Sequence, residues 1–461
     1  CAHLVDAPWV PKAGVYAVRQ GPVLIENLRR ALAEARPFRS YRPQRDFLAL
    51  LNLGDGTAVG AKWGLTASGR WVFRWKDWID RRFMRRFQAL DEEASVTAEF
   101  SSAAAMRASM DVLCGGCAAK LGQSDLERAL GRLEPAPLGA AVELGIEHGD
   151  DVAAYASRGG PRVVSSVDQF RAFTDDPWLV GRVGAVNAAS DVLAKGLRPE
   201  IAQAIIALPE SAPRNERAEL LYQVLAGARR AFDEMGVTLV GGHTTTASEL
   251  LVGFHVEGFA SPDLELLAID RLEAGSTIVL TKPLGTGVLF HADMLGRARG
   301  PWLEEAFDAM LRANDEAARI ARAHGARAAT DVTGFGLARH LAALLRASEV
   351  GGLVDVARLP ALAGVPDLFA AGLRSTFHEE NERAARGFSS DRTARAHESW
   401  PLLFDPQTSG GLLFGVPPER AEETLVALRE AGFARSAAIG ATRERTEPLL
   451  HVTVKAGSPG A

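Results

Sequence analysis

The chain contains 461 residues, of which 47% are apolar and 24% are charged, so it has room for two to four domains at roughly 100–200 residues each. Its 52 basic and 57 acidic side chains give a formal net charge of -5, which is too balanced for nucleic acid to be an expected partner of the whole molecule. Three cysteines exclude a disulfide framework and a four-cysteine zinc site, and they favour a reducing, cytoplasmic compartment.

The start of the chain shows no pattern of a targeting segment. The residues that follow Cys1 lack the basic and apolar regions of a signal peptide. No uninterrupted apolar run reaches the roughly 18–20 residues that a membrane-spanning helix needs. Because the first residue is not Met and the sequence reads as folded from its beginning, we expect the chain to be a fragment of a longer protein.

Residues 1–90 differ in composition from the rest, because they hold most of the tryptophans and many arginines. The small and polar residues 91–110 are predicted to be a linker. Residues 71–87 carry a bulky apolar side chain at every fourth position, which predicts an amphipathic helix with a cationic remainder. Those positions are Trp71, Trp75, Ile79, Phe83 and Phe87. Such a stripe packs on another part of a longer protein or makes peripheral contact with an anionic membrane.

From about residue 111 the pattern predicts an α/β (α+β) fold. Short apolar runs predict strands at 163–167, 237–240, 277–280 and 412–416. A helical pattern over 305–324 ends at Gly325, which is a favourable C-terminal stop. A boundary near 262–274 would divide this region into an N-terminal domain, 111–265, and a C-terminal domain, 266–461.

A cysteine pair lies in the segment Cys114-Gly115-Gly116-Cys117, three residues before Lys120. A nearby ammonium group favours the thiolate of Cys117, and paired glycines let the backbone approach a ligand closely. The same pattern also fits a redox pair, half of a zinc site or an ordinary buried thiol, so the segment by itself leaves its chemistry open.

Several aspartates stand where predicted strands end or helices begin. Adjacent carboxylates, such as those of Asp150 and Asp151, repel each other unless a cation or solvent neutralises them. Asp191 shares a helix face with Asn187, which lies one turn earlier. Any one of them could be a solvated or capping residue. Acids from several distant segments together suit Mg²⁺ held with a nucleoside triphosphate. The set comprises Asp150, Asp151, Asp168, Asp191 and Asp331.

Three glycine-containing turns could present backbone N–H groups to a phosphate. They lie at 241–243, 331–336 and 405–411. The chain contains neither the P-loop motif nor the G-x-G-x-x-G fingerprint at the start of a strand-turn-helix unit, which disfavours a P-loop nucleotidase and a dinucleotide-binding domain.

Taken in this order, the segments resemble a selenophosphate synthetase (selenide, water dikinase) over about residues 111–455. The ordered series is more specific than any one motif. Its members are Gly116-Cys117 with Lys120, Asp150-Asp151, 166–168, 187–191, 241–243, 281–287, 330–336 and 405–413.

The resemblance implies a two-domain fold like that of aminoimidazole ribonucleotide synthetase, usually a homodimer with ATP in a composite cleft. It implies that ATP, selenide and water give selenophosphate, phosphate and AMP. Cys117 and Lys120 are the catalytic residues by this resemblance, and the Mg²⁺ ligands are Asp151, Asp191 and Asp331. The implied nucleotide-binding positions are Lys120, Asp150, Asp168, Asp191, Gly241, Gly242 and His243.

The chain departs from the family at two places. Many members have a second cysteine where this chain has Ala119, so a mechanism that uses that second thiol is excluded. Residues 244–249 replace an acidic, proline-containing stretch, which affects the expected contacts beside 241–243.

Residues 1–90 resemble the C-terminal end of flavin-dependent pyridine-nucleotide oxidoreductases of the NADH-dehydrogenase or sulfide-quinone type, on the segment Pro11–Val23 and a predicted helix over 24–35. Both dinucleotide-binding segments of such a protein would precede Cys1. We therefore expect no flavin site in this chain.

Two other functions remain open at this stage. Another ATP-dependent enzyme of the same superfold, such as a thiamine-monophosphate kinase or an amidine-forming synthetase, would need the aspartates but not Cys117 or Lys120. A non-catalytic regulatory or membrane-docking protein would use residues 1–90 and would not need the aspartates.

Overall fold

The computed structural model describes residues 14–33, 36–44, 48–53, 57–62, 64–84, 115–116, 141–144, 148, 150–157, 159–384 and 388–454. The chain divides into two compact units, Cys1–Ala105 and Met106–Ala461. The predicted linker, 91–110, lies outside the described residues, as do Cys114, Cys117 and Lys120.

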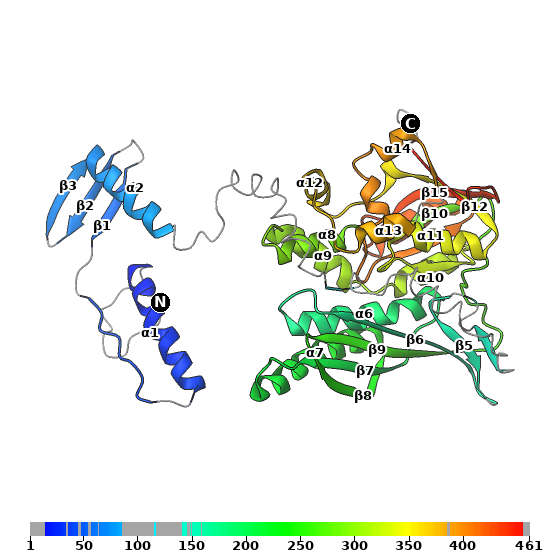
Figure 1. The fold of residues 1–461 in the computed structure, drawn as a ribbon, viewed down its shortest axis with the longest axis horizontal. Coiled ribbons are helices and arrows are strands. Elements are labelled where there is room, and N and C mark those ends of the chain that lie inside the picture. The colour runs from blue at the N-terminus through cyan, green and yellow to red at the C-terminus, as the bar shows by residue number, and fades with distance from the viewer. Residues whose placement is uncertain are drawn as a thin grey trace. The chain divides into compact units, whose positions relative to one another are not determined.

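Unit 1 combines two helices with a small antiparallel sheet (Figure 1). Helix α1 (Gly14–Leu32) is followed by strands β1 (Ala49–Asn52), β2 (Ala58–Lys62) and β3 (Leu65–Gly69), and then by helix α2 (Arg70–Met84). The helix predicted over 24–35 is the second half of α1, which begins at Gly14 and contains Pro22. A proline inside a helix removes one backbone hydrogen bond, but α1 continues through Pro22.

The helix predicted over 71–87 is present as α2 up to Met84, and residues 85–87 lie outside the described residues. The side chain that α2 turns to the sheet is not part of the predicted stripe. Val72 is 1% exposed and packs near Gly60 of β2. By contrast, Trp71, Trp75 and Trp78 are 59%, 44% and 56% exposed. These three tryptophans of α2 are therefore exposed within the part of unit 1 that the structure describes, while the smaller Val72 fits against the sheet.

The first half of unit 2 is built on a six-stranded sheet of order β4-β5-β6-β9-β7-β8. Only β7 and β8 run parallel among its described pairs, and helix α7 makes the crossover between them. The strands are β4 (Val142–Leu144), β5 (Ala153–Ala156), β6 (Arg162–Arg171), β7 (Ile201–Pro209), β8 (Thr238–Ala247) and β9 (Leu251–Ala260), and the helices are α6 (Pro177–Ala194) and α7 (Arg214–Met235).

Helix α6 is shared by the two halves of unit 2. It begins with Asp176 as the N-cap, whose carboxylate accepts a hydrogen bond from the Leu179 N–H at 3.0 Å, and with Pro177 in the first turn, both favourable starts. Most of its residues are small, apolar and buried. It packs on β6 and β9 on one side and on β11, α9 and α10 on the other (Figure 1). Polar side chains on this helix therefore need buried partners.

The second half of unit 2 contains a seven-stranded sheet of order β11-β14-β10-β15-β12-β16-β13. Helices and short 3₁₀ turns cover it. The strands are β10 (Thr277–Leu280), β11 (Ala329–Asp331), β12 (Val350–Asp355), β13 (Ser389–Ser390), β14 (Leu412–Val416), β15 (Ala437–Glu444) and β16 (Leu450–Thr453), and the helices are α8 (Thr286–Met294), α9 (Gly300–Leu311), α10 (Asp315–Ala323), α11 (Gly336–Ala347), α12 (Val365–Ala370), α13 (His378–Ala384), α14 (Arg392–Arg395) and α15 (Ala421–Glu430).

Most predicted strands of unit 2 are confirmed, and two details differ. Strands β10 and β14 have the predicted bounds, and β6 contains 163–167. The single helix predicted over 305–324 was wrong, because α9 ends at Leu311 and α10 begins at Asp315. The turn predicted at 241–243 was also wrong, since these residues lie inside β8. A Cβ at Gly242 would stand 2.2 Å from the Ala204 carbonyl oxygen of β7, so the glycine there permits close strand contact.

Among the described helices, none has both the length and the apolar character needed to cross a bilayer.

Candidate active site

Three carboxylates from distant parts of the sequence meet in unit 2. Asp151 precedes β5, Asp191 lies on α6, and Asp331 ends β11. One oxygen atom from each lies within 4.8 Å of the others. The structure thus brings together the three residues that were predicted to form a metal site.

Neighbouring hydroxyl groups hold two of these carboxylates. Ser166 Oγ of β6 donates to Asp191 Oδ2 at 2.5 Å, and Thr330 Oγ1 donates to Asp151 Oδ2 at 2.7 Å. Burial raises the pKa of Asp191 well above its ordinary value, and the negative charges of Asp331, Asp151 and Asp168 raise it further. A bound cation would relieve this repulsion.

The donor set fits Mg²⁺. This ion prefers oxygen ligands and binds through a small number of carboxylates, with substrate phosphates and water completing its shell. Within the described residues, the cluster consists of Asp151, Asp191 and Asp331, without nitrogen or sulfur ligands. The arrangement therefore suits a hard divalent cation better than zinc.

Asp150 has a different environment from its neighbour Asp151. Its Oδ1 lies 2.7 Å from Lys195 Nζ, and both side chains are almost fully buried. Burial lowers the pKa of Lys195, but the charges of Asp150, Asp151 and Asp191 outweigh it and the net direction is upward. Lys195 also donates to the Ala329 carbonyl at 3.2 Å. The ion pair thus ties the end of α6 to the segment before β5, and the hydrogen bond to Ala329 ties it to β11. The sequence did not predict this role for Asp150, and nucleotide binding by Asp150 stays a prediction.

Asp168 is connected to the C-terminal half of unit 2 through Asn187. The Asn187 side-chain amide donates to Asp168 Oδ2, and its carbonyl oxygen accepts the Ser409 N–H at 2.8 Å. Asn187 is 1% exposed, and Ser409 has a φ of 52°, in the left-handed region that residues other than glycine seldom adopt. The predicted polar face of α6 thus contacts both β6 and the segment 405–411 through Asn187.

The two described glycines before Cys117 lie in tight contact with both halves of unit 2. The Gly116 N–H donates to the Arg171 carbonyl at 2.8 Å, at the end of β6. A Cβ at Gly115 would meet the Ala172 carbonyl oxygen at 2.2 Å, and one at Gly116 would meet Thr408 Oγ1 at 2.3 Å. Only glycine fits here without a shift. The predicted roles of Cys117 and Lys120 concern positions outside the described residues.

Gly241, Gly242 and His243 do not lie beside the carboxylate cluster along the sheet. They belong to β8, and β9 and β7 separate β8 from β6, which carries Asp168. At an inter-strand spacing of about 4.8 Å, the separation is about 14 Å. Their exposed position at the sheet edge leaves nucleotide binding by these three residues a prediction.

The segment 405–411 is fixed to the start of α8 by side chains. Gln407 Oε1 accepts the N–H groups of Gly285 and Thr286 at 3.0 and 3.3 Å. Asp405 Oδ2 accepts the Gly287 N–H at 3.1 Å. Burial raises the pKa of Asp405 to about 7, against the lowering effect of its hydrogen bonds from Gln407 and from the backbone.

Sequence reasoning missed several buried polar residues around the carboxylates. Burial lowers the pKa of Lys282 to about 7, and its Nζ donates to the carbonyls of Arg312 and Ser409 at 2.6 and 3.0 Å. Lys282 and Gln407 lie in segments that carried the family resemblance, so that resemblance could have singled them out. The sequence pattern did not distinguish Lys195 or Asn314 as site residues. Lys195 directly follows the α6 helix, and Asn314 lies inside the helix that was predicted over 305–324.

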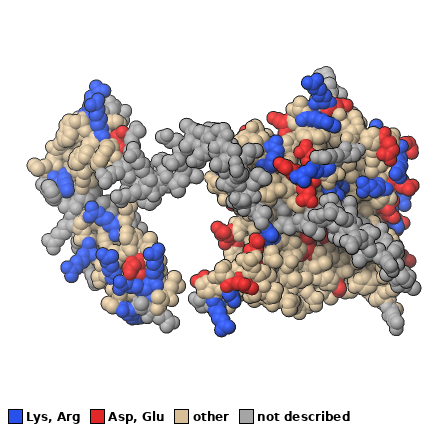
Figure 2. Space-filling view, viewed as in Figure 1, with Lys and Arg blue, Asp and Glu red and all other residues tan. Residues whose placement is uncertain are grey.

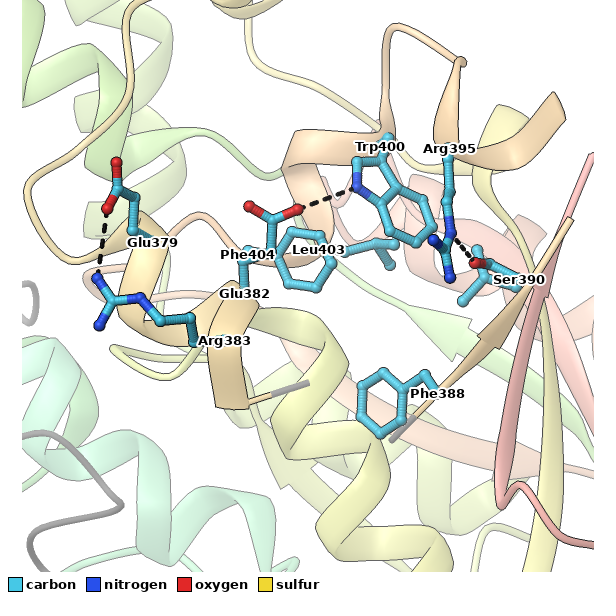
Figure 3. A pocket seen from close by; sticks show the side chains of 10 residues that line it. Glu379, Glu382, Arg383, Phe388, Ser390, Arg395, Trp400, Leu403 and Phe404 are labelled. Atoms are coloured by element: carbon cyan, nitrogen blue, oxygen red, sulfur yellow. Dashed lines mark hydrogen bonds and ion pairs between the residues drawn. The ribbon is translucent and has the colours of Figure 1, made fainter. Parts of the chain in front are cut away.

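A separate hollow of about 690 Å³ opens beside α13, β13 and the 3₁₀ turn Trp400–Leu403 (Figure 3). Its charged side chains pair with near neighbours: Arg383 lies 3.3 Å from Glu379, and Trp400 Nε1 donates to Glu382 at 3.5 Å (Figure 3). None of the described residues predicted for the site lines it, so it is distinct from the carboxylate cluster.

Comparison with known proteins identifies the fold class of unit 2. The family model for the AIR synthase related protein N-terminal domain matches residues 149–260, and that for the C-terminal domain matches residues 273–452. The solved structure of AaThiL complexed with AMPPCP and TMP has a TM-score of 0.51 and 18% sequence identity, and the match covers 73% of this chain and 94% of that chain. Unit 2 therefore has the two-domain AIR synthase-like fold.

Sequence relatives narrow the assignment further. A selenide, water dikinase from Pelobacter propionicus is 36% identical over 351 residues, which cover 76% of this chain and 99% of that protein. A selenide, water dikinase from Nitratidesulfovibrio vulgaris is 36% identical over 74% of this chain and 96% of that protein. The chain belongs to the selenide, water dikinase family and is an ATP-dependent phosphotransferase.

The buried carboxyl group of Asp405 predicts a pH-dependent stability. Its pKa rises from 3.8 to about 7 on folding, so the folded chain keeps a proton that the unfolded chain releases. The stabilisation is complete below about pH 4, falls as the pH rises toward 7 and is lost above it; its full size is on the order of 4 kcal/mol. Asp405→Asn should remove this decline from urea unfolding measured between pH 5 and 8.

Asp355→Asn provides the control, because Asp355 is also a buried carboxylate and caps the turn Val356–Arg358. The decline should persist in that variant. A decline of equal size in Asp405→Asn would contradict the assignment.

Proposed function

We propose that unit 2 converts ATP, selenide and water into selenophosphate, phosphate and AMP. The observation that carries this proposal is the convergence of Asp151, Asp191 and Asp331 within 4.8 Å, in a chain that is 36% identical to a selenide, water dikinase over 99% of that relative. Phosphoryl transfer depends on positioning and on neutralising phosphate oxygens, and a convergent carboxylate site supports both through its cation.

The proposed cation is Mg²⁺, held by Asp151, Asp191 and Asp331 and supplying charge neutralisation to the phosphates of ATP. Ser166 and Thr330 orient two of these carboxylates through their hydroxyl groups. Asp168 is the proposed nucleotide contact, and its hydrogen bond from Asn187 fixes its direction.

Cys117 is the proposed thiol for selenium chemistry, and Lys120 is the proposed phosphate contact. Their support is the family assignment together with the tight seat of Gly115 and Gly116, directly before Cys117, between β6 and Thr408. A thiolate is a strong nucleophile at neutral pH, whereas a serine hydroxyl is not.

We also propose that unit 2 forms a homodimer through the open face of its six-stranded sheet. Ser166 points to Asp191 of α6, so its neighbour Val167 points to the opposite face, where it is 60% exposed. Val240 of β8 is 55% exposed, and few charged side chains cover the sheet in Figure 2. Gly241, Gly242 and His243 would lie at this interface, where a composite nucleotide cleft could use them.

For unit 1 we propose the C-terminal part of a flavin-dependent oxidoreductase, with α2 as a surface for peripheral membrane contact. The exposed row of Trp71, Trp75 and Trp78 supports this use, because residues at i, i+4 and i+7 share one helix face and tryptophan is favoured at membrane interfaces.

The reaction itself is tested by phosphorus NMR. With Mg-ATP and selenide, the purified chain should form selenophosphate in step with AMP and phosphate. Cys117→Ser should abolish selenophosphate and leave Mg-ATP binding largely intact, because the nucleotide contacts are elsewhere. ADP as the final nucleotide, or full activity in Cys117→Ser, would contradict the proposal and favour a kinase of the same fold.

The dimer is tested by light scattering after size-exclusion chromatography. Val240→Glu should shift the chain toward monomer, because it places a charge on the proposed interface. Val426→Glu is the matched control, since Val426 is 45% exposed on α15, and it should leave the mass unchanged. A monomeric unaltered chain at micromolar concentration would refute the dimer.

Membrane contact is tested by co-sedimentation with anionic phospholipid vesicles. Binding should be present at low salt, weaken as salt screens the charges, and fall by about tenfold when Trp75 and Trp78 are both replaced by Ala. Leu65→Ala is the control, because Leu65 is 74% exposed on β3. Absence of binding at low salt would remove this proposal.

A further inference from the structure

The break between α9 and α10 contains a buried asparagine that does not cap its helix. Asn314 is at the N-cap position of α10, and its side chain makes no capping hydrogen bond. Asparagine is favoured at this position because its side-chain oxygen usually accepts an N–H from the first turn. Asn314 is nevertheless 1% exposed, and no described residue provides a hydrogen-bond donor to its Oδ1. The side chain of Asn314 therefore makes its hydrogen bonds with residues outside α10.

The amide group of Asn314 bridges the two halves of unit 2. Its Nδ2 donates to Ser190 Oγ of α6 at 2.9 Å and to the Gly410 carbonyl at 2.9 Å. Because both N–H groups of one planar amide are used, Asn314 links α6 to the segment 405–411 through a rigid group, in addition to the direct hydrogen bond from the Ser409 N–H to Asn187 Oδ1.

Each end of this bridge lies next to a carboxylate of the cluster. Ser190 immediately precedes Asp191 on α6. Beyond Gly410, the Gly411 carbonyl accepts the Val332 N–H at 2.9 Å, and Leu412 pairs with Asp331 between β14 and β11. Asn314 thus influences the spacing of Asp191 and Asp331. It contacts Ser190, which is bonded to Asp191, and it contacts Gly410, from which the chain enters the β14–β11 pairing that holds Asp331.

Two further contacts hold the break against the same segment. Lys282 Nζ links the Arg312 carbonyl to the Ser409 carbonyl, and Ser409 Oγ donates to the Met310 carbonyl at 2.6 Å. The end of α9 is therefore fixed to the segment 405–411 independently of Asn314. Removing the Asn314 amide would break the link at Ser190, the neighbour of Asp191, and would leave both this attachment and the Asn187–Ser409 hydrogen bond in place.

We propose that Asn314 is a positioning residue for the magnesium site, which sets the spacing of Asp191 and Asp331 by bridging Ser190 and Gly410. The inference rests on the proposed magnesium site and adds to it a residue that does not touch the ion.

The first test is Asn314→Ala in the full chain. The half-saturating Mg²⁺ concentration for AMP formation should rise about tenfold, as is common when a group that orients metal ligands is removed. The increase in melting temperature produced by MgCl₂ without nucleotide should shift to correspondingly higher concentrations. This second readout does not depend on catalysis.

Asn381→Ala is the matched control. Asn381 is also 1% exposed, and its Nδ2 donates to two backbone carbonyls, those of Gly334 and Phe404, at 3.0 Å each. Both partners lie in the C-terminal half, so its loss should lower the melting temperature without changing the Mg²⁺ concentration dependence. A similar shift in both variants would mean that any lost buried amide has this effect, and it would overturn the proposal.

Ser190→Ala provides a second and milder variant, which removes only the acceptor on α6. It should raise the half-saturating Mg²⁺ concentration in the same direction, and in the Asn314→Ala background it should add nothing. Should Asn314→Ala fail to fold, an Mg²⁺ dependence of Ser190→Ala within twofold of the unaltered chain would overturn the proposal.

Asp191→Asn separates this inference from the function on which it rests. If Asp191→Asn keeps the Mg²⁺ dependence, the magnesium site is wrong and the inference fails with it. If Asp191→Asn loses that dependence while the Asn314 and Ser190 variants keep it, the site stands and the positioning role alone is refuted.

Discussion

The mutual repulsion of three clustered carboxylates is the constraint on which the rest of unit 2 depends. Asp151, Asp191 and Asp331 come within 4.8 Å of one another, and their charges disfavour ionisation in a folded chain. Such a cluster persists only where the surrounding structure holds it and where a cation can neutralise it. The hydroxyls of Ser166 and Thr330 and the ammonium group of Lys195 provide that surrounding structure.

These supporting groups come from both domains and meet at α6. Asn187 and Ser190 of α6 contact the segment 405–411, directly in the first case and through Asn314 in the second. Lys195, which follows α6, pairs with Asp150 and reaches β11. Because buried polar groups are costly without partners, this network favours one relative placement of the domains over others that would leave the same groups unpaired.

The sequence was sufficient to predict the strands that are marked by a local apolar pattern. Strands β10 and β14 are short apolar runs bounded by turn residues, and both were predicted with their observed bounds. The convergence of the three aspartates was also predicted, from the resemblance to the selenophosphate synthetase family. Asn314 could not be identified in this way, because an asparagine between charged and apolar residues looks like a helix surface position. Its importance depends on Ser190 and Gly410, which are distant in sequence. The strand conformation of 241–243 was missed for a similar reason, since the close approach of Ala204 is a tertiary contact.

Helix α6 has a consequence for how the molecule folds. It supplies core residues to the six-stranded sheet on one side and to β11, α9 and α10 on the other. A chain cut in the connection between β9 and β10 would leave one fragment with an uncovered apolar helix and the other with an uncovered core surface. Because loss of either sheet exposes the helix that the other requires, we expect the two halves recognised by separate family models to unfold as one cooperative unit.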